Sequence, residues 1–285
     1  MTHQTQLETL TQINTDDILG AIGLGELRRG RGLVKLLCRP PAQRFARQVL
    51  DFDCQVGESG LAVASVDMLK TLHNQLVIQG CEHIPAHGPL FFLSNHPGLT
   101  DTIALFASIA RHDLRVLAAD RPFLRALRNT SRYLIYLDEQ KGQNRNAVRQ
   151  AVNHLKAEGA LLTFPAGKIE PDPAVLPGAV EALQSWSKSI ALFVRQVPTV
   201  RLVPVMVKGV LNPQAQRHPL RLLRRSQKDR EWLAAMLQIL IPAYQSVTVQ
   251  VRFAPPLQLA YLRQNDDAVM SAVRASMQAM IEDCQ

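Results

Sequence analysis

Short apolar runs bounded by turn residues alternate along this chain with longer stretches in which apolar residues recur every three or four positions. The short runs predict buried strands, and the longer period predicts amphipathic helices. The predicted strands cover residues 76–80, 89–94, 114–119, 134–137, 160–164, 202–207 and 247–253. Strands that alternate with helical patterns are typical of an α/β fold, so we expect a core of the α/β class.

Helical patterns dominate the rest of the chain. Residues 145–155 predict an amphipathic helix, residues 268–282 a closing helix, and residues 217–243 an inserted amphipathic helix pair. A basic helical segment is expected at the start, although residues 1–14 are polar and indicate a frayed tail. We therefore divide the chain into an N-terminal basic segment (1–72), an α/β core (73–256) and a C-terminal helix (257–285).

The turn after the strand at 89–94 carries the most informative chemistry. It reads Asn95-His96-Pro97-Gly98-Leu99-Thr100-Asp101. The Pro-Gly pair predicts a tight turn, and Thr100 is the expected N-cap of the helix that follows. A histidine with a carboxylate at one ring nitrogen can take a proton from a hydroxyl group with the other. His96 and Asp101 are thus candidate catalytic residues, and an ordinary strand-to-helix loop is the alternative.

Three further segments accompany this turn. Residues 80–85 read Gly-Cys-Glu-His-Ile-Pro, residues 164–168 read Phe-Pro-Ala-Gly-Lys, and residues 202–207 form an apolar run with a Val-Pro pair. In this order and spacing they resemble the PlsC-like family of glycerolipid acyltransferases, over about residues 74–210. The resemblance implies transfer of a fatty acyl group from acyl-coenzyme A or acyl-carrier protein to a lysolipid hydroxyl, such as that of 1-acylglycerol-3-phosphate. It also implies a mixed central sheet flanked by helices. In that reading His96 is the general base and Asp101 fixes its tautomer.

The third motif departs from that family. Where the family has Phe-Pro-Glu-Gly-Thr-Arg, this chain has Ala166 in place of the acidic residue, and Lys168 stands one position before the usual Arg. Either Lys168 and Glu170 are a shifted form of the same polar pair, or the acceptor differs, because Lys cannot grip a phosphate in the bidentate way of Arg. Both are candidate substrate-binding residues, and backbone N–H groups near Gly167 are candidate donors to the tetrahedral oxyanion.

Between these motifs, Arg121, Arg125 and Arg128 are spaced so that they would share one face of a helix. Their place matches the family's second motif, an acceptor-binding segment, and guanidinium groups suit phosphate geometry. We expect them to bind the phosphates of the acceptor or of coenzyme A, with a solvated basic face as the alternative. Two further functions stay open: an acyltransferase that acts on a non-glycerophosphate lipid, and an inactive membrane- or lipid-binding homologue.

The net charge of +8 calls for an anionic partner. Basic residues interleave with Leu and Phe at residues 28–49 and 217–230, a pattern that suits helices in the headgroup layer of an anionic membrane. A solvated basic surface is the alternative. Nucleic acid is disfavoured as a partner because aromatic residues make up only 5% of the chain and do not interleave with the basic runs.

Composition limits the cellular setting. No apolar stretch is long enough to predict a transmembrane helix, and residues 1–14 lack the pattern of a secretory signal. The four cysteines show no metal-ligand spacing, so we expect free thiols, no metal and no cofactor besides the acyl donor. The expected location is the cytoplasm, peripheral on the cytoplasmic face of the membrane.

Overall fold

The computed structural model describes residues 3–25, 30–109, 111–138 and 144–283. They form two compact units. A helical unit comprises Met1–Gln75, Arg121–Ser131 and Leu211–Val247, and a sheet unit comprises Leu76–Asp120, Arg132–Val210 and Thr248–Gln285. Each unit is thus assembled from three separate stretches, and the consecutive division into 1–72, 73–256 and 257–285 stays a prediction.

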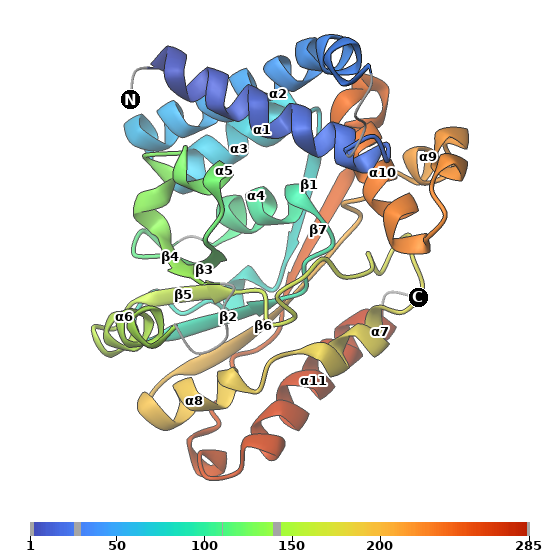
Figure 1. The fold of residues 1–285 in the computed structure, drawn as a ribbon. Coiled ribbons are helices and arrows are strands. Elements are labelled where there is room, and N and C mark those ends of the chain that lie inside the picture. Colours follow the sequence, from blue (N-terminus) through green and yellow to red (C-terminus); the bar gives the residue numbers. More distant parts are fainter. Residues whose placement is uncertain (1–2, 26–29, 110, 139–143, 284–285) are drawn as a thin grey trace. The chain divides into compact units, whose positions relative to one another are not determined.

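A mixed seven-stranded sheet organises the sheet unit, in the order β1-β7-β6-β2-β5-β3-β4 (Figure 1). The strands are β1 (Gln75–Gln79), β2 (Leu90–Ser94), β3 (Arg115–Ala119), β4 (Leu134–Leu137), β5 (Ala160–Thr163), β6 (Arg201–Lys208) and β7 (Thr248–Phe253). Strand β2 pairs in parallel with both β5 and β6, and β7 runs antiparallel to β6. The predicted mixed sheet is confirmed, and every predicted strand lies within one residue of the observed one.

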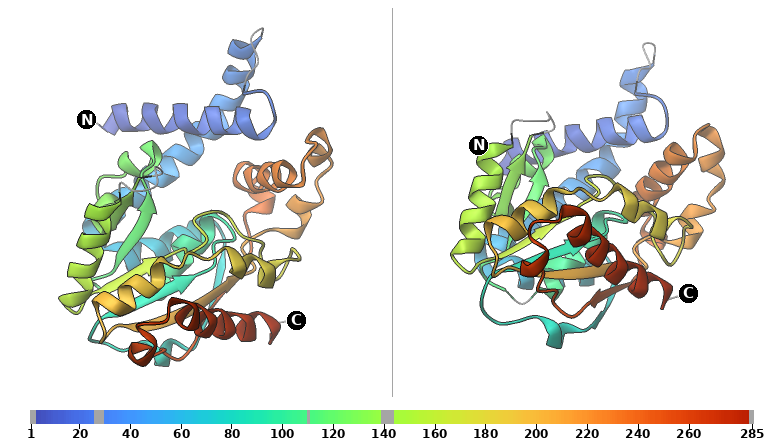
Figure 2. Two further views of the ribbon diagram at one scale, coloured as in Figure 1. Left: turned by 60° about the horizontal axis from the view of Figure 1, so that its bottom comes forward. Right: turned by 90° about the horizontal axis from the view of Figure 1, so that it is seen from below.

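Helices cover both faces of this sheet. Figures 1 and 2 show α6 (Arg145–Lys156), α8 (Ser189–Gln196) and α11 (Asp266–Glu282) on one face and α4 (Leu99–Ser108) on the other. All five residues of β2 are buried, as expected for a parallel strand with both faces covered. Phe91 of β2 packs on Phe193 of α8 with ring centroids 4.8 Å apart. The predicted amphipathic helix at 145–155 and the closing helix are confirmed.

The helical unit contains α1 (His3–Ala21), α2 (Arg31–Ser59), α3 (Leu61–Thr71) and α10 (Gln227–Leu240). The expected frayed tail is wrong from His3 onward, because Leu7 and Leu10 of α1 pack against Leu50 of α2. Of the helix pair predicted at 217–243, one α-helix is observed and the other is not. Its first part is a short 3-10 turn, Pro219–Leu223, and only α10 is a full α-helix. Among the described residues, no helix has the length and apolar character needed to cross a membrane.

A buried carboxylate joins α2 to the segment that carries the three arginines. Asp53 accepts hydrogen bonds from Asn129 N, Thr130 N and Thr130 Oγ1 at 3.1, 2.8 and 2.7 Å. The preceding helix, α5 (Pro122–Arg125), has only four residues. The expectation of one shared helix face is therefore wrong, since Arg121 precedes the helix and Arg128 lies beyond its end.

Asp53→Ala should lower the free energy of unfolding by about 2–4 kcal/mol, because it leaves buried N–H groups without an acceptor. Urea denaturation measures the loss. Asp51→Ala on the same helix is the control, because Asp51 is exposed, and it should change stability by less than about 0.5 kcal/mol. Equal stabilities for the two variants would show that this carboxylate does not hold the segment.

Candidate active site

The candidate site lies at the carboxyl ends of adjacent parallel strands, the edge where open α/β sheets place their ligands. His96 follows β2 and Phe164 follows β5, and the register pairs Leu93 with Thr163. As a result the two aromatic rings stack, with centroids 4.3 Å apart and planes inclined by 27°. Phe164 thus supports one face of the imidazole.

The residue before His96 locks the chain to the neighbouring strand. Buried Asn95 donates from Nδ2 to Val207 O and accepts at Oδ1 from Val207 N, both at 2.8 Å. The Asn95 side chain thus continues the hydrogen bonding between β2 and β6 beyond the last backbone pair, Ser94 with Val205. Asn95 is therefore a supporting residue that sequence reasoning placed in the motif without a role. The available signal was the polar pair Ser94-Asn95 directly after the apolar residues 90–93.

His96 and Asp101 form the central contact. The distance between His96 Nδ1 and Asp101 Oδ2 is 2.8 Å. The Asp101 side chain is fully buried, whereas 25% of the His96 side chain is exposed. Since Nδ1 is held by the carboxylate, the other ring nitrogen, Nε2, is the one that can exchange a proton with a bound molecule.

The Asp101 carboxylate also stabilises the first turn of helix α4. Its Oδ2 accepts from Gly98 N at 2.9 Å, and its Oδ1 accepts from Thr102 Oγ1 at 2.9 Å. Helix α4 starts at Leu99 with Gly98 as its N-cap, so the expectation that Thr100 is the N-cap is wrong. The reason is that a carboxylate in the first turn reaches back to the N-cap N–H, which leaves the capping role to the backbone of the turn.

The loop from Phe164 to Asp172 closes around His96. Glu170 N donates to His96 O at 2.8 Å, and His96 N donates to Glu170 Oε2 at 3.1 Å. Glu170 Oε1 accepts from Trp186 Nε1 at 2.8 Å. Two residues later, buried Asp172 accepts from Gly209 N and Val210 N at 2.9 and 2.7 Å. The loop is thus fastened to the ends of both β2 and β6.

The charges around His96 change its titration. Burial alone would lower the pKa of His96, but the charge and hydrogen bond of Asp101, together with the charge of Glu170, raise it above the ordinary value of 6.5. Burial raises the pKa of Glu170, although hydrogen bonds from Trp186 and from His96 N oppose the shift. The site therefore favours the imidazolium form of His96.

The remaining predicted residues are more exposed. Gly167 has φ 63°, a left-handed turn conformation that suits glycine, and its N–H donates to Phe164 O at 3.0 Å. Lys168 is exposed on the same turn. Arg121, Arg125 and Arg128 are exposed and belong to the helical unit. The sheet unit therefore brings together His96, Asp101, Glu170 and the Gly167–Lys168 turn.

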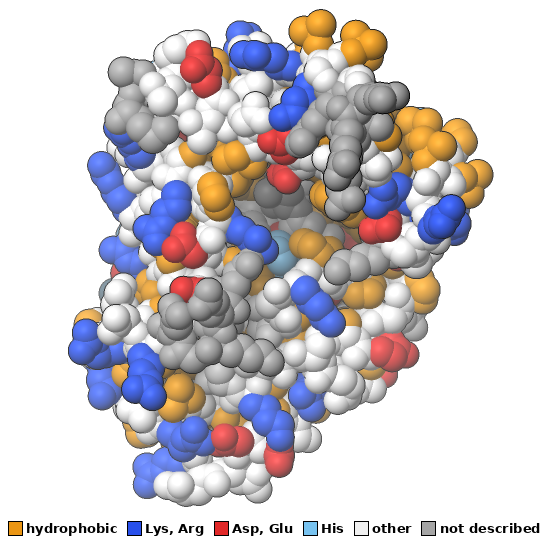
Figure 3. Space-filling view, viewed as in Figure 1, with side chains coloured by type: hydrophobic (Ala, Val, Ile, Leu, Met, Phe, Trp, Pro, Cys, Tyr) orange, Lys and Arg blue, Asp and Glu red, His pale blue; other side chains and the backbone are white. Residues whose placement is uncertain are grey.

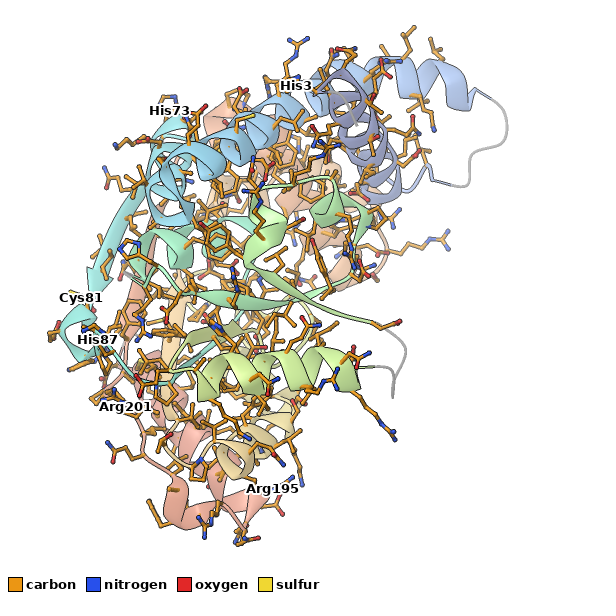
Figure 4. All side chains as sticks on the ribbon, turned by 90° about the vertical axis from the view of Figure 1, so that its left-hand side faces the viewer. His3, His73, Cys81, His87, Arg195 and Arg201 are labelled. Atoms are coloured by element: carbon orange, nitrogen blue, oxygen red, sulfur yellow. The ribbon has the colours of Figure 1, made fainter. Side chains whose placement is uncertain are left out.

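Figure 4 shows His87 and Cys81 together in the loop between β1 and β2, at the amino end of β2. Arg201 donates to His87 O there at 2.8 Å, so this histidine has a structural surrounding distinct from that of His96. Within the described ranges, no group of three or more His, Cys, Asp or Glu side chains could hold a metal ion. Cys38, Cys54 and Cys81 are free thiols, and Cys284 lies outside the described residues.

Comparisons with known proteins agree with this arrangement. Residues 75–208 match the family model described as Acyltransferase. The crystal structure of the 1-acyl-sn-glycerophosphate acyltransferase PlsC from Thermotoga maritima is similar in fold, with a TM-score of 0.51 and 16% identity, over 98% of this chain and 96% of that one. No curated protein matches the chain.

The raised pKa of His96 can be tested by NMR titration of the histidine ring signals. The signal that His96→Ala removes should titrate above pH 6.5 in the wild type. Asp101→Asn removes the neighbouring negative charge, so the same signal should then titrate at lower pH. The signals of the other histidines should not move between the two proteins. An unchanged His96 titration in Asp101→Asn would contradict this electrostatic picture.

Proposed function

We propose that this chain is a PlsC-like acyltransferase, which transfers a fatty acyl group from acyl-coenzyme A or acyl-carrier protein to a lysolipid hydroxyl such as that of 1-acylglycerol-3-phosphate. One observation carries the proposal. His96 lies at the carboxyl edge of the sheet with Nδ1 held at 2.8 Å by a buried carboxylate, which leaves Nε2 for the hydroxyl proton. This is the arrangement that base-assisted acyl transfer requires.

In the proposed reaction, His96 Nε2 removes the hydroxyl proton while the hydroxyl oxygen forms a bond to the thioester carbonyl carbon. The carbon–sulfur bond then breaks, and the proton on Nε2 passes to the leaving thiolate. Asp101 stabilises the imidazolium between these steps and keeps its ring oriented. No metal or prosthetic group takes part.

The tetrahedral oxyanion needs hydrogen-bond donors. Gly167 N–H is already donated to Phe164 O, so the neighbouring amide of Lys168 is the better candidate. Each unit also supplies exposed cations suited to the phosphates of the acceptor or donor: Lys168 in the sheet unit, and Arg121, Arg125 and Arg128 in the helical unit. An acceptor other than a glycerophosphate is the second candidate, favoured by Ala166 at the position where the family carries an acidic residue.

We further propose that the helical unit binds the cytoplasmic face of a membrane, at a surface of anionic lipids. Leu36 and Leu37 of α2 are 66% and 69% exposed, and Arg39 beside them is also exposed. Figure 3 shows hydrophobic side chains gathered over the start of α2 and over the segment around α9 (Pro213–Gln216), with Lys and Arg side chains nearby. Arg28 and Arg29, which the charge pattern also assigned to this surface, lie outside the described residues.

The second basic cluster supports the same partner. A hollow of about 460 Å³ is lined by Arg217, Arg221 and Arg230, and the side chain of Leu222 at its rim is largely exposed. Guanidinium groups bind phosphate oxygens, and an exposed leucine favours the acyl boundary of a bilayer. Apolar and cationic side chains are thus combined at both places in the helical unit.

His96→Ala should lower kcat by about 10²–10⁴-fold, the usual loss for a positioned general base. Asp101→Asn should cost nearly as much, since the imidazole loses its orienting partner. Release of free thiol from acyl-coenzyme A, with a panel of lysolipid acceptors and products identified by mass, measures the effect.

His87→Ala is the matched control, because His87 lies at the opposite end of β2 and should leave kcat unchanged. More than half of the wild-type activity in His96→Ala would overturn the proposed mechanism. Thiol release that no lysolipid accelerates, even in the wild type, would count against a lysolipid acceptor.

Binding to vesicles of phosphatidylcholine with phosphatidylglycerol should weaken as salt rises, because the Debye length shortens to about 3 Å at 1 M. Replacing Leu36 and Leu37 together by Ser should weaken binding roughly tenfold or more, since one buried leucine side chain contributes about 1.5–3 kcal/mol. Val63→Ser on α3 is the control, because Val63 is also exposed but lies outside both clusters. Flotation with the vesicles measures binding, and equal binding to pure phosphatidylcholine would refute the electrostatic part.

A further inference from the structure

Glu170 is a second buried carboxylate beside His96, and the mechanism above leaves it without a role. Only 4% of Glu170 is exposed. It holds the main chain of His96 at both polar groups: its carboxylate accepts from His96 N at 3.1 Å, and its own N–H donates to His96 O at 2.8 Å. Glu170 therefore occupies both the main-chain N–H and the carbonyl oxygen of His96. A substrate would have to displace Glu170 to bind the N–H group.

The hydrogen bonds of Glu170 fit the ionised form. Trp186 Nε1 donates to Oε1 and His96 N donates to Oε2, so each oxygen faces a donor. A protonated carboxyl group would instead place an O–H against one of these N–H groups. The charge is removed from water by burial, and the two donors compensate part of that cost.

The sequence of the loop explains why Glu170 points inward. Pro171 and Pro173 favour an extended backbone in the residues before them, Glu170 and Asp172. In an extended stretch, alternate side chains lie on the same side. Glu170 and Asp172 are accordingly both buried, whereas Ile169 is 61% exposed.

We propose that Glu170 is a positioning residue for His96, one that holds the main chain of the base in place and sets a negative charge close to it. This role rests on the proposed function, since it matters for turnover only if His96 is the base. It concerns the main chain of His96, whereas Asp101 acts on Nδ1 of its ring.

Glu170→Gln tests the proposal, because it keeps the size of the side chain but sets an NH2 group against one of the two donors. We expect kcat to fall roughly 10–100-fold through misplacement of the base, with little change in either KM. Loss of the negative charge should also move the acid limb of the kcat/KM profile to lower pH, because Glu170 contributes to the raised pKa of His96. Glu181→Gln, the same change at an exposed site of the sheet unit, should alter neither quantity.

Glu170→Asp separates the two effects. It restores the charge but shortens the side chain, so the acid limb should return toward the wild-type pH while kcat stays reduced. A residue that merely stabilises the fold would lower the melting temperature without moving the acid limb. Thermal denaturation of each variant is therefore recorded beside its pH profile.

NMR titration of His96 separates failure of this proposal from failure of the proposed function. If the wild type transfers no acyl group, yet His96 titrates at lower pH in Glu170→Gln, the electrostatic contact of Glu170 with His96 is upheld and the proposed function fails. If kcat stays within threefold of wild type and His96 titrates unchanged in Glu170→Gln, the positioning role is overturned. Should Glu170→Gln not fold, wild-type kcat in Glu170→Asp overturns it equally.

Discussion

The burial of the Asp101 carboxylate is the constraint on which the site depends. A charge removed from water is costly unless hydrogen bonds replace the lost solvent, and here His96, Gly98 and Thr102 supply them. The same bonds start α4, close the turn after β2 and aim the imidazole. One carboxylate therefore links the local fold of the turn to the orientation of the imidazole, and its loss affects both together.

The sheet supplies the rest of the geometry. Parallel pairing of β2 with β5 and β6 brings three loops to one edge, and buried polar side chains then fasten these loops to each other. Asn95 joins the first loop to β6, Glu170 joins the second to His96, and Asp172 joins it to the end of β6. Because each of these groups is buried and paired, the edge is held by directional bonds as well as by apolar packing.

The sequence predicted the central strands β2, β5 and β6 well because each is a short, mostly apolar run, a pattern set by burial on both faces. It also predicted the His96 and Asp101 pair, which lies within one turn of chain. It failed where distant residues compete with local preference. Asp53 binds the backbone at Asn129 and Thr130, just after the arginine segment, from more than seventy positions away. The contact of Glu170 with His96 spans a similar distance and has no local signature.

In the proposed reaction, the acidic surroundings of His96 would act in two opposing ways on its work as a base. A raised pKa makes the imidazole a stronger base toward a hydroxyl group, and negative charge nearby stabilises the imidazolium that proton transfer creates. The same shift enlarges the fraction of His96 that is already protonated near neutral pH and cannot accept a proton. Burial, which alone would lower the pKa, limits that fraction. The burial of the His96 ring between Phe164 and the loop of residues 164–172 therefore affects two quantities. One is the strength of His96 as a base, and the other is the fraction of His96 that is unprotonated.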